Sequence, residues 1–194
     1  MAEETANRPA RYADLHDLPE NVVGEIIGGE LVTHPRPAPR HARSASTLGA
    51  LVTPPFDLGS GGPGGWIILD EPELHLGEDI LVPDLAGWRR ERMAELPGTT
   101  WFEVVPDWVC EVISPGTART DRLLKLPRYA RYGVAHCWLV DPGTRTVEAL
   151  ANQDGEHWTI VGTAVEADEA ALPPFDAVAL DFGLLWADVE PPEV

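Results

Sequence analysis

The sequence predicts a protein of the α/β class that begins with a β-hairpin. Residues 22–32, VVGEIIGGELV, alternate around the glycine pair at 28–29, which is typical of a hairpin with a two-residue turn. Two apolar runs, 108–113 and 136–140, each end at a turn signal, and the segment between them has helical spacing. A strand, a helix and a strand in this order form a crossover unit with parallel strands.

The length of 194 residues and the mass of 21.1 kDa correspond to one domain. We expect this domain to span residues 12–188. Composition predicts a flexible N-terminus over residues 1–11 and a C-terminal tail over residues 189–194.

The elements around the hairpin follow from proline and glycine positions. A short helix is expected over 12–18, and a longer helix from about His41 to Val52, after the proline-rich segment 33–40. The run PPFDLGSGGPGG at 54–65 predicts a flexible loop. It lacks the Gly-Lys-Ser/Thr of a phosphate-binding loop.

Strands are expected next at 66–69, 72–76 and 80–88. The last of these, ILVPDLAGW, holds a single acid, Asp84, directly after Pro83. The apolar strand 108–113 likewise holds a single acid, Glu111. Each acid requires an explanation, because a buried charge is costly unless it is paired or binds a metal.

The crossover helix is expected to begin at a cap, Thr117 or Thr120, and to end at Gly133. Pro127 lies within it and predicts a late start or a bend. The C-terminal part predicts a hairpin at a sheet edge, 146–151 with 157–161, then an acidic loop at 164–171. A short strand and a terminal turn are expected within 178–186.

The formal charge of −18 argues against a polyanionic partner, but the charge is unevenly distributed. Residues 1–145 hold 21 acids and 14 bases, and no lysine or arginine follows Arg145. The helical segment 119–131 carries five bases and one acid. This basic stripe can face a phosphate chain, although a solvated helix face is the simpler interpretation.

Neither a membrane segment nor a signal peptide is predicted. No apolar run reaches 18 residues, and the N-terminus lacks a charged region followed by an apolar one, so we expect a cytoplasmic protein. Cys110 and Cys137 lie on predicted strands without metal-type spacing and are expected to be buried, reduced thiols.

Lys125 is the only lysine, against thirteen arginines. A lysine is a compact charge with a tunable pKa, which an arginine cannot replace. Asp84 and Glu111 on neighbouring strands would form an oxygen-rich site for Mg²⁺ or Mn²⁺. Beside it, Lys125 could stabilise a phosphoryl transition state or help deprotonate the attacking water. The alternative is structural: Asp84 caps a turn and Glu111 pairs with an arginine.

These residues carry a family resemblance. The segments VPDLAGW, PDWVCEVISP and TDRLLKLPRYARYGVAHCWLVDP resemble the Uma-type restriction endonuclease family of the PD-(D/E)XK nuclease superfamily. GEIIGGELV, the PxPxxxH pattern ending at His41, and VDPGTRTVEAL add to the match over roughly residues 20–185. The resemblance implies a restriction-endonuclease-like fold, a mixed central sheet flanked by helices. It also implies Mg²⁺-dependent phosphodiester hydrolysis and a homodimer.

The resemblance assigns Asp84 to the PD half-motif and Glu111 to the acid of the other half. The lysine position of that motif holds Ile113, and the lysine is moved to the following helix, which corresponds to Lys125. Glu25 resembles the N-terminal glutamate of the family and could complete the metal shell; otherwise it is a surface residue of the hairpin.

Residues with supporting roles are less specific. Asp121 could orient Lys125 from four residues away, or form an ordinary helix salt bridge. His41 is a weaker candidate, as are Glu71 and Glu73, and Tyr129 is expected to pack in the core. The arginines of the helical stripe are candidates for phosphate contacts: Arg119, Arg122, Arg128 and Arg131.

The sequence therefore predicts a Mg²⁺- or Mn²⁺-dependent endonuclease that acts on nucleic acid, with DNA as the expected substrate and a homodimer as the expected assembly. Two alternatives remain. The same fold can serve as a catalytically inactive binding or assembly module, which the acidic composition favours. A metal-dependent hydrolase of small phosphoesters would also suit an acidic surface.

Overall fold

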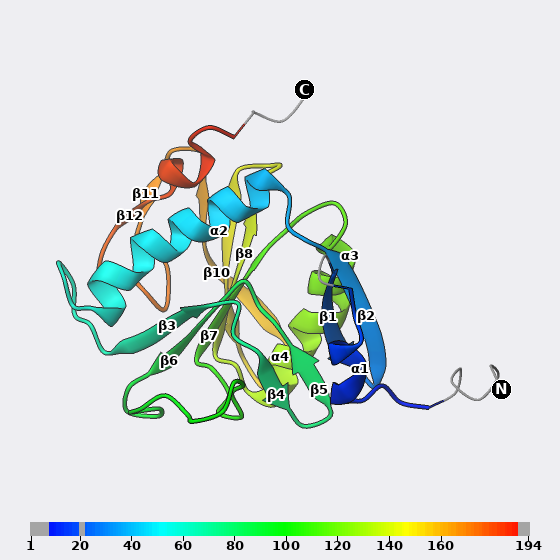
Figure 1. Cartoon of the computed structure of the whole chain (residues 1–194). Coiled ribbons are helices and arrows are strands. Elements are labelled where there is room, and N and C mark those ends of the chain that lie inside the picture. Colours follow the sequence, from blue (N-terminus) through cyan, green and yellow to red (C-terminus); the bar gives the residue numbers. More distant parts are fainter. Residues whose placement is uncertain (1–7, 20–21, 190–194) are drawn as a thin grey trace.

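The structure is a computed structural model that describes residues 8–19 and 22–189. Its main sheet comprises six strands: β3 (Trp66–Asp70), β6 (Leu85–Arg89), β7 (Trp108–Val112), β8 (His136–Asp141), β9 (Thr146–Asn152) and β10 (Trp158–Val165). Their order is β10-β9-β8-β7-β6-β3 (Figure 1). β7 and β8 are parallel and the other neighbours are antiparallel, so the predicted crossover unit and the α/β class with a mixed sheet are confirmed.

A smaller antiparallel sheet lies beside the main one. It contains β1 (Val22–Ile27), β2 (Glu30–Pro35), β4 (Leu74–Leu76) and β5 (Asp79–Leu81), in the order β2-β1-β5-β4. The predicted hairpin is confirmed as β1–β2, and Gly28 and Gly29 adopt φ values of 64° and 77°, which glycine tolerates best. The short helix α1 (Tyr12–His16) contacts β1.

The predicted ends of the chain are described only in part. Residues 1–7 and 190–194 lie outside the described residues. Within residues 8–11, the N–H of Ala10 donates to the carbonyl of Gly29 at 2.7 Å, which links this segment to the hairpin turn.

The prediction of one strand over 80–88 is wrong. β5 ends at Leu81 in the small sheet, and β6 begins at Leu85 in the main sheet. Pro83 lies between them; it cannot donate a ladder hydrogen bond and restricts the residue before it. The break passes the chain from one sheet to the other and leaves Asp84 at the junction.

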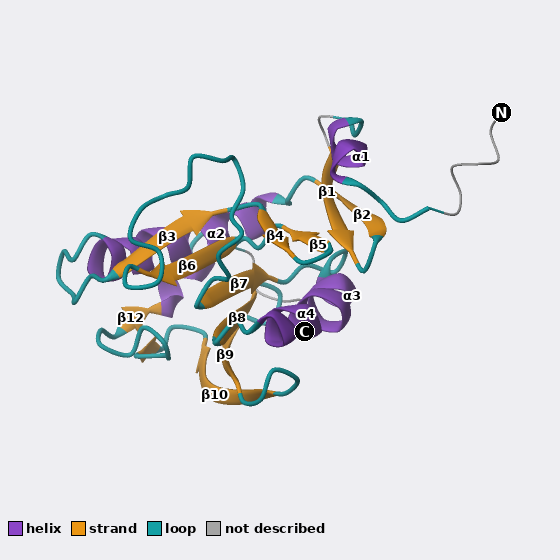
Figure 2. Ribbon diagram, turned by 90° about the horizontal axis from the view of Figure 1, so that it is seen from below, coloured by secondary structure: helices purple, strands orange, loops and turns teal. Residues whose placement is uncertain are grey.

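Helices cover both faces of the main sheet (Figure 2). α2 (Pro39–Val52) lies on one face, and the other carries α3 (Ala118–Thr120), the π-helical turn η2 (Asp121–Lys125) and α4 (Leu126–Tyr132). The irregularity predicted around Pro127 is present, because η2 directly precedes this proline. Leu126 donates to the carbonyl five residues back, Asp121, instead of four.

Alternation along β7 gives each face its own core. Trp108, Cys110 and Val112 belong to the cluster beneath α2, and Val109 belongs to the cluster beneath α4. Glu111 therefore faces the α4 side, where Lys125 and Tyr129 lie. Both cysteines are buried and free.

Two loop predictions are corrected. Part of the segment 54–65 is helical: η1 (Thr53–Asp57) continues α2 as a π-helical turn, because buried Phe56 packs against Phe175 with ring centroids 4.7 Å apart. The predicted acidic loop 164–171 contains the end of β10 and the strand β11 (Glu169–Ala170), which pairs with β12 (Leu180–Asp181). A 3-10 helix follows (Phe182–Trp186).

No helix in residues 8–19 and 22–189 is long and apolar enough to cross a bilayer.

The predicted edge hairpin is confirmed as β9–β10, with β10 at the edge of the main sheet.

Candidate active site

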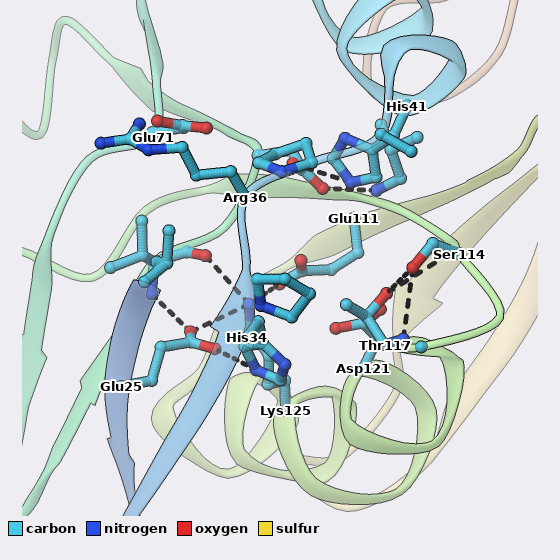
Figure 3. A pocket seen from close by; sticks show the side chains of 18 of the residues that line it. Glu25, His34, Arg36, His41, Glu71, Glu111, Ser114, Thr117, Asp121 and Lys125 are labelled. Carbon is cyan, nitrogen blue, oxygen red and sulfur yellow. Dashed lines mark hydrogen bonds and ion pairs between the residues drawn. The ribbon is translucent and has the colours of Figure 1, made fainter. Parts of the chain in front are cut away.

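The residues singled out from the sequence meet where the two sheets join. Glu25 comes from β1, Asp84 from the β5–β6 junction, Glu111 from β7 and Lys125 from the end of η2. All four line one pocket of about 310 Å³. In Figure 3, Glu25 and Glu111 point toward Lys125 from opposite sides.

Lys125 is held by three acceptors although its side chain is only 3% exposed. Its Nζ lies 2.8 Å from Glu111 Oε1 and 3.0 Å from Glu25 Oε1, and it donates to the carbonyl of Val82 at 2.9 Å. These contacts match the three N–H donors of an ammonium group. The amine therefore has a single, defined position at the wall of the pocket.

Glu25 is buried in the hairpin, so the interpretation as a surface residue is wrong. Its Oε1 accepts the N–H of Val82 at 2.7 Å, and its Oε2 lies 3.4 Å from His34 Nε2. Burial opposes its ionisation, but Lys125, His34 and the Val82 N–H outweigh this effect and lower the pKa of Glu25. The hairpin thus places a carboxylate, favoured in its charged form, beside Lys125.

Glu111 is shared between Lys125 and a tyrosine. The hydroxyl of Tyr129 donates to Glu111 Oε1 at 2.6 Å, and both side chains are buried. Tyr129 lies one turn after Lys125 on the same helix, so its spacing was the signal that could have identified this role. It orients the carboxylate in addition to packing in the core.

Asp84 is fixed from two elements. Its Oδ2 accepts the N–H of Val112 on β7 at 2.6 Å, and its Oδ1 lies 3.2 Å from Nε2 of His41 in the first turn of α2. The backbone bond holds Asp84 against the strand that carries Glu111. Neither acid has the structural role considered as an alternative, since Asp84 bonds to another strand and Glu111 pairs with the lysine.

Negative charge exceeds positive charge around Lys125. Burial raises the pKa of Glu111 well above its usual range, and the charges of Asp121, Asp84 and Glu25 add to this shift. Burial likewise raises the pKa of Asp121. For Lys125, burial opposes the charged form, but the surrounding carboxylates raise its pKa overall. One ammonium group does not balance the charge of these carboxylates. The excess negative charge favours binding of a proton or a cation by the site.

The donor set fits Mg²⁺ or Mn²⁺. In the described part of the chain, no group of three or more histidine, cysteine, aspartate or glutamate side chains is arranged to enclose a metal. Mg²⁺ needs fewer protein ligands, because it commonly binds through one or two carboxylates and keeps water and substrate phosphate as its other ligands. Asp84 and Glu111 supply two carboxylates in the same pocket.

The other candidates separate into two groups. Asp121, His41 and Glu71 line the pocket. Asp121 was expected to orient Lys125, but the ion pairs of Lys125 within the described residues are with Glu25 and Glu111. Glu73 is not among the residues that line the pocket, and it pairs with His75 at 2.7 Å.

The arginine stripe does not line the pocket. Arg119 is exposed. Arg122 pairs with Glu148 at 3.1 Å, and Arg128 and Arg131 lie 3.1 and 3.7 Å from Asp79. The basic residue that the sequence did not single out is Arg36, which follows β2 and lines the pocket.

Comparison with known proteins gives a family. A family model described as "Uma2: Putative restriction endonuclease" matches residues 10–184. The chain belongs to the Uma2 family. The crystal structure of a "putative nuclease belonging to DUF820" from Anabaena variabilis is similar to this Uma2 chain, with a TM-score of 0.70 and 22% sequence identity over 92% of this chain and 98% of that one. No curated protein sequence matches the chain.

Proposed function

We propose that this Uma2 protein is a nuclease that hydrolyses phosphodiester bonds of nucleic acid with Mg²⁺ or Mn²⁺, and that DNA is its substrate. The observation that carries the proposal is the meeting of Asp84, Glu111 and Lys125 in one pocket. Membership of a family described as "Putative restriction endonuclease" supports the same reaction class.

In this proposal Asp84 and Glu111 hold the metal, which when bound polarises a phosphoryl oxygen and lowers the pKa of bound water. Lys125 stabilises the negative charge that develops on the phosphoryl oxygens. Because the surrounding carboxylates raise its pKa, Lys125 stays charged and is suited to this role more than to that of a base.

Three further residues position the reactive groups. Glu25 holds Lys125 through an ion pair of 3.0 Å. Tyr129 orients Glu111, and His41 orients Asp84. None of the three needs to contact the substrate, and each restricts a reactive side chain to one rotamer, which is what a pre-organised site requires.

Cleavage of single- and double-stranded DNA in Mg²⁺ and in Mn²⁺ tests the proposal directly. We expect Asp84→Asn, Glu111→Gln and Lys125→Ala each to reduce the rate at least about 100-fold, the usual scale for a lost electrostatic contact. Asp107→Asn is the matched control, because Asp107 is also buried and is ion-paired with Arg92 at 2.7 Å but does not line the pocket. Equal cleavage by Lys125→Ala would contradict the proposal.

A binding or assembly module without catalysis is the second candidate. Three of the four arginines of the helical stripe form ion pairs with acids of the same chain. They are therefore less available for the phosphate contacts that a nuclease needs, and this observation favours a module without catalysis. Such a module would show no cleavage with either metal.

A homodimer also remains a prediction, and light scattering coupled to size-exclusion chromatography would measure it.

A further inference from the structure

Three neighbouring cavities share lining residues, starting from the reactive pocket. The pocket that contains Lys125 shares Ala38, His41, Ser114 and Pro115 with a second cavity of about 530 Å³. This second cavity shares Ala38 and Arg40 with a third of about 550 Å³. Because each cavity has lining residues in common with the next, we call the three together the α2 track. It runs over the beginning of α2.

Arginines line the α2 track along its length. Arg36 lines the first cavity, Arg40 the second and third, and Arg43 the third. All three are exposed. This series differs from the stripe on α3, η2 and α4, because its members lie on the path that leaves the reactive pocket.

Arg40 is the member whose charge is least compensated. Among the described residues, no acidic side chain forms an ion pair with Arg40, whereas Arg43 lies 3.7 Å from Asp188. The acid that shares the second cavity with Arg40 is Asp141. Its Oδ1 already accepts the N–H groups of Gly143 and Thr144, at 2.8 and 3.2 Å. Arg40 is therefore the arginine that an anion in this cavity can reach, and the Asp141 carboxylate is engaged by its own turn.

The depth of the reactive pocket limits what can enter. The side chains of Lys125 and Glu111 are 3% and 4% exposed, and that of Asp84 is 14% exposed. A volume of about 310 Å³ is at the lower end of small-molecule sites, which span roughly 300–1,000 Å³. An unpaired nucleotide fits such a space and an intact duplex does not.

The small number of arginines along the α2 track agrees with this limit. Duplex-binding proteins typically neutralise roughly 6–10 phosphates and bury about 1,000–2,500 Å². The α2 track offers three arginines, Arg36, Arg40 and Arg43. That number suits a short stretch of one strand.

The geometry points to the α2 track as the binding site for a single nucleic-acid strand, with a phosphate close to the reactive one bound by Arg40. This inference rests on the proposed function and narrows its substrate to unpaired nucleic acid, such as single strands, overhangs and flaps. The strand leaves the Lys125 pocket beside His41 and continues across the first turn of α2.

Binding by labelled oligonucleotides tests the α2 track. The full-length protein is titrated in Ca²⁺, which limits cleavage, with fluorescent oligothymidylates and oligouridylates of two, four and eight nucleotides and with an eight-base-pair DNA duplex. We expect the eight-nucleotide strand of at least one sugar type to bind at least about ten times more tightly than the duplex. Affinity should rise from two to four nucleotides, because the longer strand reaches Arg40.

Arg40→Ala is the decisive variant, since Arg40 is exposed and its loss leaves the fold intact. We expect it to weaken binding of the eight-nucleotide strand about 5-fold. The slope of log Kd against log salt should fall by about 0.7, the value for one phosphate contact on a single strand. Arg122→Ala removes an exposed arginine from the helical stripe and should change neither quantity.

The outcomes separate the two proposals. Duplex binding as tight as strand binding, or equal effects of Arg40→Ala and Arg122→Ala, would overturn the α2 track. If duplex is then cleaved in a Lys125-dependent manner, the proposed nuclease stands without it. Strand binding that depends on Arg40 but leads to no cleavage in Mg²⁺ or Mn²⁺ would support the track and reject the nuclease.

Discussion

Lys125 shows why one lysine persists among thirteen arginines. Its side chain is 3% exposed, and its ammonium contacts two carboxylates and a carbonyl. A planar guanidinium with five N–H donors would leave some of them unsatisfied at this position. The isolation of this residue in the sequence was therefore a correct signal of a special environment. Its two carboxylate partners, by contrast, lie 100 and 14 positions away and follow no local rule.

Replacing Lys125 by methionine should destabilise the metal-free protein by about 3–5 kcal/mol, because Glu25 and Glu111 would remain buried without their shared cation. Urea denaturation in EDTA measures the loss. Arg122→Met is the control; its exposed ion pair with Glu148 should contribute no more than about 1 kcal/mol. Equal losses would mean that Lys125 is not the electrostatic centre of the site.

His41 should make stability depend on pH. Burial lowers its pKa, but the hydrogen bond and charge of Asp84, with Asp121 and Glu71, outweigh this and raise the pKa above the usual 6.5. The folded state thus binds a proton more tightly than the unfolded chain. This stabilisation is fully present below pH 6.5 and is lost as the pH rises through the folded-state pKa.

His41→Gln should accordingly cost more unfolding free energy at about pH 5.5 than at about pH 8.5, measured in EDTA. The packing lost with the imidazole contributes equally at both pH values, so the difference reports the charge. A cost that does not change with pH would show that His41 stays neutral in the folded protein.

At the scale of elements, the β1–β2 hairpin has to be fixed to the helix that carries Lys125. Asp79 at the start of β5 does this: its Oδ1 accepts the N–H of Gly28 at 2.5 Å and Nε–H of Arg128 at 3.1 Å. Its Oδ2 accepts the hydroxyl of Tyr132 at 2.6 Å. The side chain is completely buried, so these contacts hold hairpin, strand and α4 together.

Asp79→Ala should lower the unfolding free energy by about 3 kcal/mol or more, because three donors from the hairpin and α4 lose their shared charged acceptor. Hydrogen exchange should accelerate in residues 22–35, the part that the aspartate anchors. Asp154→Ala removes an exposed acid paired with His157 and should leave the unfolding free energy nearly unchanged, because water screens an exposed pair. Unchanged exchange in the hairpin would refute the anchoring role.

The whole molecule is strongly acidic, and the site concentrates part of this charge at the sheet junction. If Asp84 and Glu111 bind a divalent cation, the ion should stabilise the fold by RT ln(1 + [M]/Kd), about 2.7 kcal/mol at 100 times Kd. Thermal unfolding with increasing Mn²⁺ measures this. We expect the increase to disappear in Asp84→Asn; an equal increase in that variant would place the ion elsewhere on the acidic surface.

The sequence by itself determined the α/β class, the hairpin, the crossover unit and the family. These follow from periodicity, turn residues and motifs, which lie within short stretches of chain. Asp84, Glu111 and Lys125 could be named in the same way, because a lone charge in an apolar run is visible locally. The position of Tyr129 one helical turn after Lys125 was also visible in the sequence. Its hydrogen bond to Glu111 was not.

Only the tertiary structure decided how the chain divides at Pro83 between two sheets, that Glu25 is buried against Lys125, and that the arginines of the stripe turn away from the pocket. Each of these depends on contacts between segments far apart in the chain. The choice among several acids for one ammonium is made by packing and burial. Neither is encoded in local spacing.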